Sequence, residues 1–456
     1  METVVAFDIG TTHLKWITVE MASGQVVAHG QTLIEATARG PASEQDPVRI
    51  GSLMEGVLRK ARESGAVQSV GLSAAMHTFM AVDGSGRPLT QSWTWMDQRA
   101  APAAQHVRQS VAESQALRAV TGVPVHAMSP LMKWMAARPA LPADARPVAL
   151  KDFLVYQLTG TWTTDYSTAS ASGFLGLDGR WSDRALALAA IDASQLPAVR
   201  MMADRVKSRE GSFDVVIGGT DAAMAHGHLH IPSDGSVAVV AMGTSGAMRV
   251  TSTAPAGDPA LFCYTMGPDA GYLVGSAFSN VGNVLEWLGS LFGLSVDQIL
   301  EQGIEAIRSG RRLPRALPYW HGERSPWWRE DLTGSWAGMG PGTTSADLAG
   351  ATILAITASY WQGLEALRRV GAPVREVRAG SGLMAHPVMG QWMADALSRD
   401  IVFYDERDAS LMGAVDLARN HPPAAPAESR RFRPQGDWGA RVAAEWECIR
   451  TAMAGL

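Results

Sequence analysis

Short apolar runs that end in glycine mark the first predicted strands of the chain. Thr3–Ile9 is such a run, and Gly10-Thr11-Thr12 follows it directly. Leu14–Glu20 comes next and ends at the turn signal Ser23-Gly24. Two strands joined by so short a turn predict a β-hairpin, unlike the strand-to-helix entry of a dinucleotide-binding fold.

Longer segments combine apolar and polar positions at helical spacing, and a further buried strand is expected at Ser69–Ala75, leading into Met76-His77. The pattern predicts helices over residues 47–64, 102–120, 129–138, 183–190, 279–292, 345–370 and 387–397. Strands and helices that alternate in this way are typical of an α/β protein.

Near residue 215 the strand pattern of the N-terminus starts again. Val215–Gly218 is an apolar strand that ends in Gly219-Thr220-Asp221. Ser236–Met242 then ends in Gly243-Thr244-Ser245-Gly246, and a further strand, Ala247–Thr251, follows. This pattern predicts two related lobes that each present a turn of small residues toward a shared cleft. A chance similarity between two short turns is the alternative.

Composition limits the class of protein. A chain of 456 residues is too long for one ordinary core, so two domains are expected. The net charge of −5 is spread along the chain without a basic stripe, which argues against a nucleic-acid partner. Two cysteines, a start without a signal peptide and no apolar run of about 18 residues predict a cytoplasmic protein with no membrane segment.

The Gly-Thr turns at residues 10–12 and 243–245 are candidate phosphate-binding loops. Glycine lets the backbone approach an anion, and neighbouring N–H groups and hydroxyls donate to its oxygens. Lys15 could add a point charge, and Asp8, at the end of the first strand, could hold a Mg²⁺ bound to phosphates. Ordinary hairpin turns, with Asp8 capping one of them, remain the alternative.

Asp221 is the candidate general base. It follows a buried strand and a glycine turn, and it is expected at the N-cap or in the first turn of a helix. There the helix dipole favours the ionised form, which could take a proton from a hydroxyl during phosphoryl transfer. Asp is also a common structural N-cap, and that role stays open.

Several segments together resemble the FGGY family of carbohydrate kinases, and they occur in that family's order. The resemblance covers residues 3 to about 420 and implies an actin-like fold of two ribonuclease H-like lobes with the active site in the cleft between them. The segments are FDIGTTHLK (7–15), GLSAAMHTFMAVD (71–83), SWTWMDQRA (92–100), TGVPVHAMSPLMKW (121–134), DYSTASASG (165–173), VIGGTDAAMAHG (216–227), AMGTSGAMR (241–249), FSNVGNVLEWL (278–288), LPYWHGERSPWW (317–328), GSWAGM (334–339), RAGSGLMAHPVMGQWMADAL (378–397) and ERDASLMGAV (406–415).

The resemblance also implies a role for each candidate residue. Asp221 matches the catalytic base and Asp8 the acidic residue near the metal, while Met76, His77, Asp97 and Asp221 are assigned to the sugar site. Nucleotide binding is assigned to Thr11, Thr12, Lys15, Gly243, Thr244, Gly282, Glu286, Gly382 and His386. ATP and Mg²⁺ are the expected cosubstrate and cofactor, and a homodimer is expected. The expected domains are an N-terminal sugar-binding lobe (1–228), a C-terminal nucleotide-binding lobe (229–425) and a peripheral tail (426–456).

The substrate is expected to be gluconate, which would give 6-phosphogluconate. The forms Ser73–His77 and Trp95–Arg99 look most like the gluconokinases of the family. The carboxylate of gluconate needs a cation or N–H donors, and Arg99, Lys133, Lys151 and His77 are candidates to provide them. The alternatives are a kinase for xylulose or another ketose or polyol, and a non-catalytic actin-like ATP-binding regulator.

Overall fold

The computed structural model describes residues 1–405, 408–421 and 427–455, without the side chain of Ser381, and it divides into two compact units. Unit 1 comprises Met1–His230, Cys263–Leu273 and Asp408–Ala425, and unit 2 comprises Ile231–Phe262, Val274–Arg407 and Pro426–Leu456. Residues 408–421 therefore return to unit 1, although they were expected in the C-terminal lobe. The expected boundary at residue 425 lies outside the described residues.

Unit 1 carries most of the short elements. Its strands are β1 (Glu2–Ile9), β2 (His13–Glu20), β3 (Val26–Leu33), β4 (Thr37–Arg39), β5 (Ala42–Gln45), β6 (Ala66–Ala74), β7 (Met80–Val82), β8 (Ser92–Trp93), β9 (Arg146–Val148), β10 (Thr163–Asp165), β11 (Ala198–Arg200), β12 (Arg205–Lys207), β13 (Asp214–Val216) and β14 (Gly219–Thr220). Its helices are α1 (Pro47–Ser64), α2 (Ala101–Gln109), α3 (Val111–Thr121), α4 (Pro130–Ala137), α5 (Leu150–Thr159), α6 (Tyr166–Ala171), α7 (Asp183–Ala189), α8 (Asp221–His228) and α13 (Ala409–Arg419).

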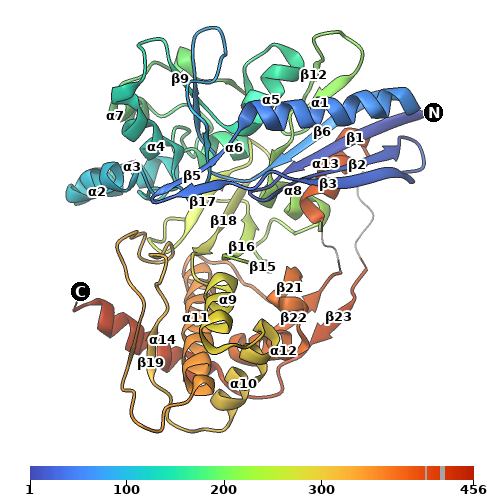
Figure 1. The fold of residues 1–456 in the computed structure, drawn as a ribbon. Coiled ribbons are helices and arrows are strands. Elements are labelled where there is room, and N and C mark those ends of the chain that lie inside the picture. The colour runs from blue at the N-terminus through green and yellow to red at the C-terminus, as the bar shows by residue number, and fades with distance from the viewer. Residues whose placement is uncertain (406–407, 422–426, 456) are drawn as a thin grey trace. The chain divides into compact units, whose positions relative to one another are not determined.

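The main sheet of unit 1 has the order β12-β13-β6-β1-β2-β3, and β14 also pairs with β6. Figure 1 shows α1 and α5 on one face of this sheet and α8 and α13 on the other. The apolar residues agree with this arrangement. Met54 of α1 and Phe153 of α5 belong to one buried cluster, and Met224 of α8 and Val415 of α13 belong to another. The central strands β1 and β6 are buried on both faces of the sheet, which is why they read as nearly continuous apolar runs.

Unit 2 repeats this topology. Its sheets are built from β15 (Val237–Met242), β16 (Gly246–Ser252), β17 (Phe262–Thr265), β18 (Tyr272–Phe278), β19 (Arg315–Leu317), β20 (Ser335–Ala337), β21 (Glu376–Gly382), β22 (Asp400–Phe403) and β23 (Arg430–Phe432). Of these, the part of β17 from Cys263 onward and the first two residues of β18 belong to unit 1. The sheet has the order β17-β18-β16-β15-β21-β22-β23. As in unit 1, the first strand pairs antiparallel with the second and parallel with a later one (β1 with β2 and β6, β15 with β16 and β21). The predicted repeat is therefore present in the strand order.

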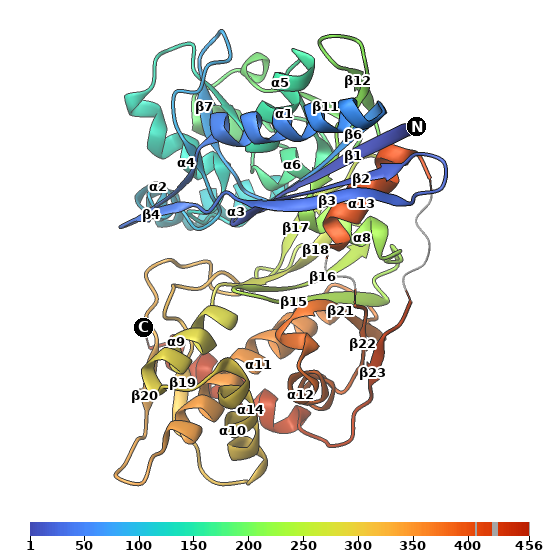
Figure 2. The ribbon, with the colours of Figure 1, turned by 45° about the vertical axis from the view of Figure 1, so that its right-hand side comes forward.

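The helices of unit 2 are α9 (Gly282–Phe292), α10 (Val296–Arg308), α11 (Ser345–Arg369), α12 (Pro387–Leu397) and α14 (Gly439–Met453). Figure 2 shows α9 to α12 and α14 gathered beside this sheet. The expected helix over 102–120 is divided into α2 and α3 at Ser110, whose hydroxyl caps α3 by accepting from the N–H of Glu113. No helix of the described residues is both long and apolar enough to cross a membrane.

The expected peripheral tail contains α14, one side of which is buried. Val442, Trp446, Ile449 and Met453 recur at helical spacing on its buried side, and the helix packs on α11. Trp446 also stacks on Trp327 at a centroid distance of 5.8 Å. This segment thus contributes to the core of unit 2.

Trp446→Ala is expected to destabilise unit 2 by about 3–5 kcal/mol, because it removes a large buried ring and leaves a cavity. Urea unfolding followed by circular dichroism measures the change. The matched control is Glu447→Ala on the exposed side of the same helix, which should stay within about 0.5 kcal/mol of the parent because Glu447 makes only an exposed pair with Arg450. Equal stability of Trp446→Ala and the parent would contradict the packing role.

Candidate active site

Three neighbouring parallel strands of unit 1 end at one edge of the sheet. Ile9 of β1 pairs with Ala74 of β6, and Ala74 pairs with Thr220 of β14. Parallel strands present their carboxyl ends at the same edge, where ligands of open α/β sheets bind. The residues that follow these strands, including the Gly10–Thr12 turn, Met76-His77 and Asp221, therefore start from one row of the sheet.

Asp221 is the first residue of α8, and Thr220 is the N-cap. The Thr220 hydroxyl accepts from the N–H of Ala223, whereas Oδ1 of Asp221 accepts from the N–H of Ala222 at 2.8 Å. The expected position in the first helical turn is confirmed, and the N-cap role belongs to Thr220. Asp221 is half-buried at the positive end of the helix dipole, which favours its ionised form.

A tight glycine turn places Asp221. Gly218 has a φ of +65°, and a Cβ atom on it would lie 1.7 Å from the carbonyl oxygen of Leu72 in β6. Only glycine adopts this conformation so close to a neighbouring strand. The chain can thus cross from β13 to β14 and start α8 beside the end of β6.

The turn between β1 and β2 is held by a residue that the sequence analysis did not identify. Nε2 of Gln45 in β5 donates to the carbonyl oxygens of Gly10 at 3.0 Å, Thr11 at 2.9 Å and Ile34 at 3.1 Å. Gln45 is buried. It binds the carbonyl groups of the turn that carries Thr11 and Thr12. No motif in the sequence predicted this role of Gln45.

Asp8 and Lys15 face each other across the first hairpin, because they are paired in the register of β1 and β2. The hydroxyls of Ser73 and Ser410 donate to the two oxygens of Asp8 at 2.7 and 3.0 Å. Burial raises the pKa of Asp8, while these hydrogen bonds and the charge of Lys15 oppose the rise. The Lys15 ammonium lies 2.6 Å from Oδ1 of Asp408.

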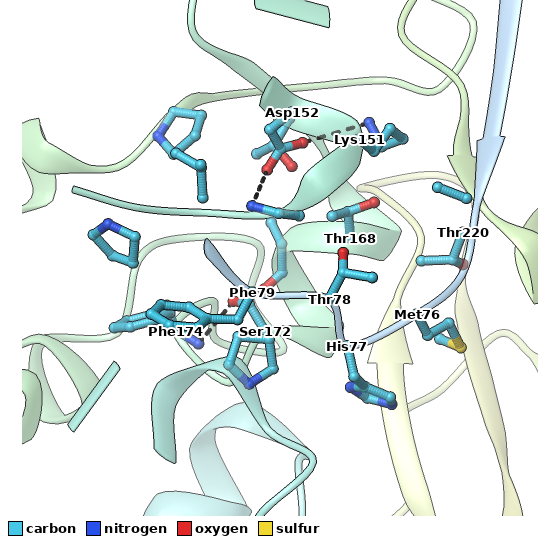
Figure 3. A pocket seen from close by; sticks show the side chains of 18 of the residues that line it. Met76, His77, Thr78, Phe79, Lys151, Asp152, Thr168, Ser172, Phe174 and Thr220 are labelled. Atoms are coloured by element: carbon cyan, nitrogen blue, oxygen red, sulfur yellow. Dashed lines mark hydrogen bonds and ion pairs between the residues drawn. The ribbon is translucent and has the colours of Figure 1, made fainter. Parts of the chain in front are cut away.

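Met76, His77 and Thr220 line one pocket of unit 1 together with Thr78, Thr168, Lys151 and Asp152 (Figure 3). His77 has a φ of +61°. Its Nδ1 donates to the carbonyl of Ala171 at 3.0 Å, and in the neutral ring Nε2 is left to accept from the Tyr264 hydroxyl at 3.4 Å. Met76 and His77, two of the four residues expected at the sugar site, thus share a pocket with Thr220, the residue next to Asp221.

Asp97 does not line this pocket. Its carboxylate is fully buried, accepts from the N–H of Ser43 at 2.9 Å and pairs with Arg99 at 2.6 Å. These two contacts are made by Oδ2, and Oδ1 accepts from the N–H of Arg99 at 3.0 Å, so both oxygens of Asp97 bind groups of the protein itself. Arg99 also pairs with Glu44 at 2.6 Å and lies over the ring of Trp93.

The three cations considered for a substrate carboxylate all bind protein acceptors. Besides Arg99, the buried ammonium of Lys133 donates to the carbonyls of His77 and Thr94. The buried ammonium of Lys151 lies 3.1 Å from Asp165 and 3.6 Å from Asp152. Burial raises the pKa of Asp152 to about 6, although Lys151 opposes the rise.

In unit 2, four of the candidate nucleotide residues lie together. The N–H of Gly282, at the start of α9, donates to the carbonyl of Gly243 at 2.9 Å, and the N–H of Asn283 donates to that of Thr244 at 3.1 Å. A Cβ atom on Gly282 would lie 2.5 Å from the Gly243 oxygen, and one on Gly382 would lie 2.2 Å from the Met242 oxygen. Glycine allows both backbones to approach the second turn this closely.

Glu286 and His386 are less directly connected to this cluster. Glu286 lies one turn further along α9 and is exposed. His386 precedes α12, and its Nε2 is 3.9 Å from Asp297 and from Glu301 of α10, too far for a hydrogen bond.

A buried carboxylate supports the approach to α9. Glu323 accepts from the N–H groups of Ser279 and Arg324 at 2.7 and 2.8 Å and from the amide of Asn280 at 3.1 Å. Burial raises its pKa to about 7. The Gly322-Glu323-Arg324 turn inside a Trp-rich stretch was the available sequence signal, but Ser279 and Asn280, two of the three partners of Glu323, lie more than 40 residues earlier.

Comparison with known proteins agrees with these observations. Residues 3–221 match the N-terminal domain of the FGGY family of carbohydrate kinases, and residues 238–419 match its C-terminal domain. The chain belongs to the FGGY family of carbohydrate kinases. It is therefore a phosphotransferase with an alcohol group as acceptor, and kinases of this family use ATP. The alternative of a non-catalytic regulator is not supported.

Individual relatives are distant. The chain is 26% identical to a gluconokinase of Bacillus subtilis over 449 residues, which covers 91% of this chain and 86% of that protein. It is 24% identical to a xylulose kinase of Staphylococcus xylosus, covering 92% and 90%. A gluconate kinase structure from Lactobacillus acidophilus matches with a TM-score of 0.89 at 22% identity, covering 100% and 98%. The actin-like, ribonuclease H-like fold expected from the motifs is confirmed.

Gly282→Ala is expected to raise the KM for ATP by about tenfold or more and to lower the melting temperature, because the new methyl group overlaps the Gly243 carbonyl. Steady-state kinetics and a thermal melt measure the two effects. Gly340→Ala is the control, since no atom lies within 4 Å of its added Cβ, and it should match the parent. A parent-like KM in Gly282→Ala would contradict the close approach of α9 to the turn.

Proposed function

We propose that this kinase transfers the γ-phosphoryl group of ATP to the terminal hydroxyl of gluconate, giving 6-phosphogluconate, with Asp221 as the general base. The observation that carries the proposal is the position of Asp221. It begins α8 at the carboxyl end of β14, in register with the strand that precedes Met76-His77 and with the strand that carries Asp8. A base for phosphoryl transfer must meet the acceptor hydroxyl and the phosphate together.

Each group of site residues has one task in this proposal. Asp221 orients the hydroxyl and accepts its proton, and Met76 and His77 contact the sugar. Thr11, Thr12 and Lys15 hold phosphate oxygens from unit 1. Gly243, Thr244, Gly282 and Gly382 hold the nucleotide from unit 2, with Glu286 and His386 beside them.

The residues present fit a Mg²⁺ ion bound through Asp8. Asp8 is an oxygen donor bound by two hydroxyls, and its nearest ammonium, that of Lys15, pairs with Asp408 instead. Among the described residues no three His, Cys, Asp or Glu side chains form a metal-binding group. Magnesium takes one or two carboxylates together with phosphates and waters, and Asp8 can supply one of these carboxylates. When bound, the ion would neutralise charge on the phosphates.

Gluconate is supported by the relatives, since gluconokinases of Bacillus subtilis and Bacillus licheniformis are 26% and 27% identical to the chain. A ketose or polyol is the second candidate, and one observation favours it. Arg99, Lys133 and Lys151 are all bound to acceptors of the protein, so a substrate carboxylate would have to find other donors or displace these pairs.

Asp221→Asn is expected to lower kcat by about 10²–10⁴-fold, because the amide has no capacity to accept the proton. A coupled ADP-release assay measures turnover, and the rise in melting temperature with a non-hydrolysable ATP analogue checks that nucleotide binding is intact. Asp214→Asn, at the start of β13 in an ion pair with Lys207, is the matched control and should retain parent activity. Turnover of Asp221→Asn within about threefold of the parent would exclude Asp221 as the base.

A panel of gluconate, xylulose and glycerol separates the substrate candidates. Gluconate is expected to give a kcat/KM at least about tenfold above either neutral compound, and to raise the melting temperature most in the presence of the ATP analogue. A higher kcat/KM with xylulose than with gluconate would reject gluconate and support the ketose alternative.

A further inference from the structure

Lys133 is a fully buried lysine of unit 1. It lies on α4, and its ammonium donates to the carbonyl oxygen of His77 at 2.7 Å and to that of Thr94 at 2.6 Å. Neither acceptor is charged. Thr94 lies 39 residues and His77 lies 56 residues before Lys133 in the chain, so these contacts exist only in the folded unit.

The two carbonyls belong to the two segments that carry the candidate sugar residues. Phe79 and Trp93 exchange backbone hydrogen bonds at 3.0 and 2.7 Å. The segment that ends at Phe79 begins with Met76-His77, and the segment that starts at Trp93 continues to Asp97. The Lys133 ammonium joins these segments at His77, two residues before Phe79, and at Thr94, one residue after Trp93.

The two acceptor residues, His77 and Thr94, each lie at a particular backbone feature, a left-handed conformation and a turn. His77 adopts a φ of +61°, a conformation that is uncommon for residues other than glycine. Its ring is fixed separately, by the carbonyl of Ala171 and the hydroxyl of Tyr264. The Thr94 carbonyl also accepts from the N–H of Asp97 at 3.1 Å, so the ammonium binds the turn that places Asp97.

Burying an ammonium group in a protein core costs free energy, because the charge loses its hydration. Burial lowers the pKa of Lys133 to about 7, an effect that Arg99 increases and Asp97 opposes. An apolar side chain of the same length would avoid the cost of removing a charge from water. Packing alone therefore does not explain why this position carries a lysine. The need to hold two carbonyl groups together with hydrogen bonds does explain it.

We propose that Lys133 is a positioning residue for the sugar site, whose ammonium holds the Met76-His77 segment and the turn leading to Asp97 in their substrate-binding arrangement. This role rests on the proposed function, because it assumes that Met76 and His77 contact the sugar. It acts through the backbone of His77 and Thr94, and Lys133 itself does not touch the substrate.

The test compares Lys133→Met with the parent in the full-length chain, using whichever compound of the sugar panel supports ADP release. Lys133→Met keeps the unbranched shape and removes the donors. The KM for the sugar is expected to rise at least about tenfold, while the KM for ATP stays within about twofold of the parent. A general loss of stability would not divide the two constants in this way.

Leu58→Ala is the matched control for stability. Leu58 is buried in α1, which packs on β1 and β6, so its truncation lowers the melting temperature while both KM values should stay within about twofold of the parent. If Lys133→Met does not fold, Lys133→Gln takes its place, because its shorter side chain keeps donors that do not reach both carbonyls. The expected rise in the sugar KM is then about fivefold or more.

The outcomes separate the two proposals. A folded Lys133→Met or Lys133→Gln with a sugar KM within about twofold of the parent, or with equal increases in both KM values, overturns the positioning role and leaves the proposed function standing. A parent chain that releases ADP with none of the sugars overturns the proposed function, and the positioning role fails with it.

Discussion

The candidate site depends on the parallel pairing of β1, β6 and β14 in unit 1. This pairing puts the ends of three strands in one row, although they are separated by more than 60 and by about 140 residues along the chain. It is stable only because Gly218 has no side chain, since any Cβ atom there would overlap the carbonyl of Leu72. Without that turn β14 could not reach β6, and Asp221 would not start its helix beside the strand that leads to Met76-His77.

Unit 2 reaches a similar result by the same means. Gly282 and Gly382 bring α9 and β21 against the turn at Gly243 closely enough that a methyl group would not fit. In both units the strand order, the antiparallel hairpin and the small-residue turn recur together. The two turns are therefore equivalent positions of a repeated topology, each supported by long-range contacts of its own: Gln45 in unit 1 and the start of α9 in unit 2.

Buried ions shape the sugar-site segments of unit 1. Arg99, Lys133 and Lys151 looked like available donors for a substrate because their partners could not be seen in the sequence. In the fold each one satisfies acceptors of the chain: Asp97 and Glu44, two main-chain carbonyls, and Asp165. A charge that is removed from water needs such a partner. Each cation therefore holds the loop around it in place and is less available to a ligand.

The sequence by itself determined the local elements and the family. Apolar runs ending at a glycine turn identified β1, β2 and β15, other apolar runs identified β6 and β16, and helical spacing identified α1, α9, α11 and α12 within a few residues. These features depend on neighbours in the chain. The break at Ser110 was missed because a local cap outweighed a continuous helical pattern, and α14 was missed because its buried side is defined by α11.

Only the tertiary structure decided which side chains meet. Gln45 at the first turn, Asp408 and Ser410 beside Lys15 and Asp8, and Lys133 between His77 and Thr94 all act on residues far away in the chain. Their residue types were visible, but a hydrogen bond or an ion pair depends on distances of a few ångströms, and those distances arise from strand register and helix packing rather than from spacing along the sequence.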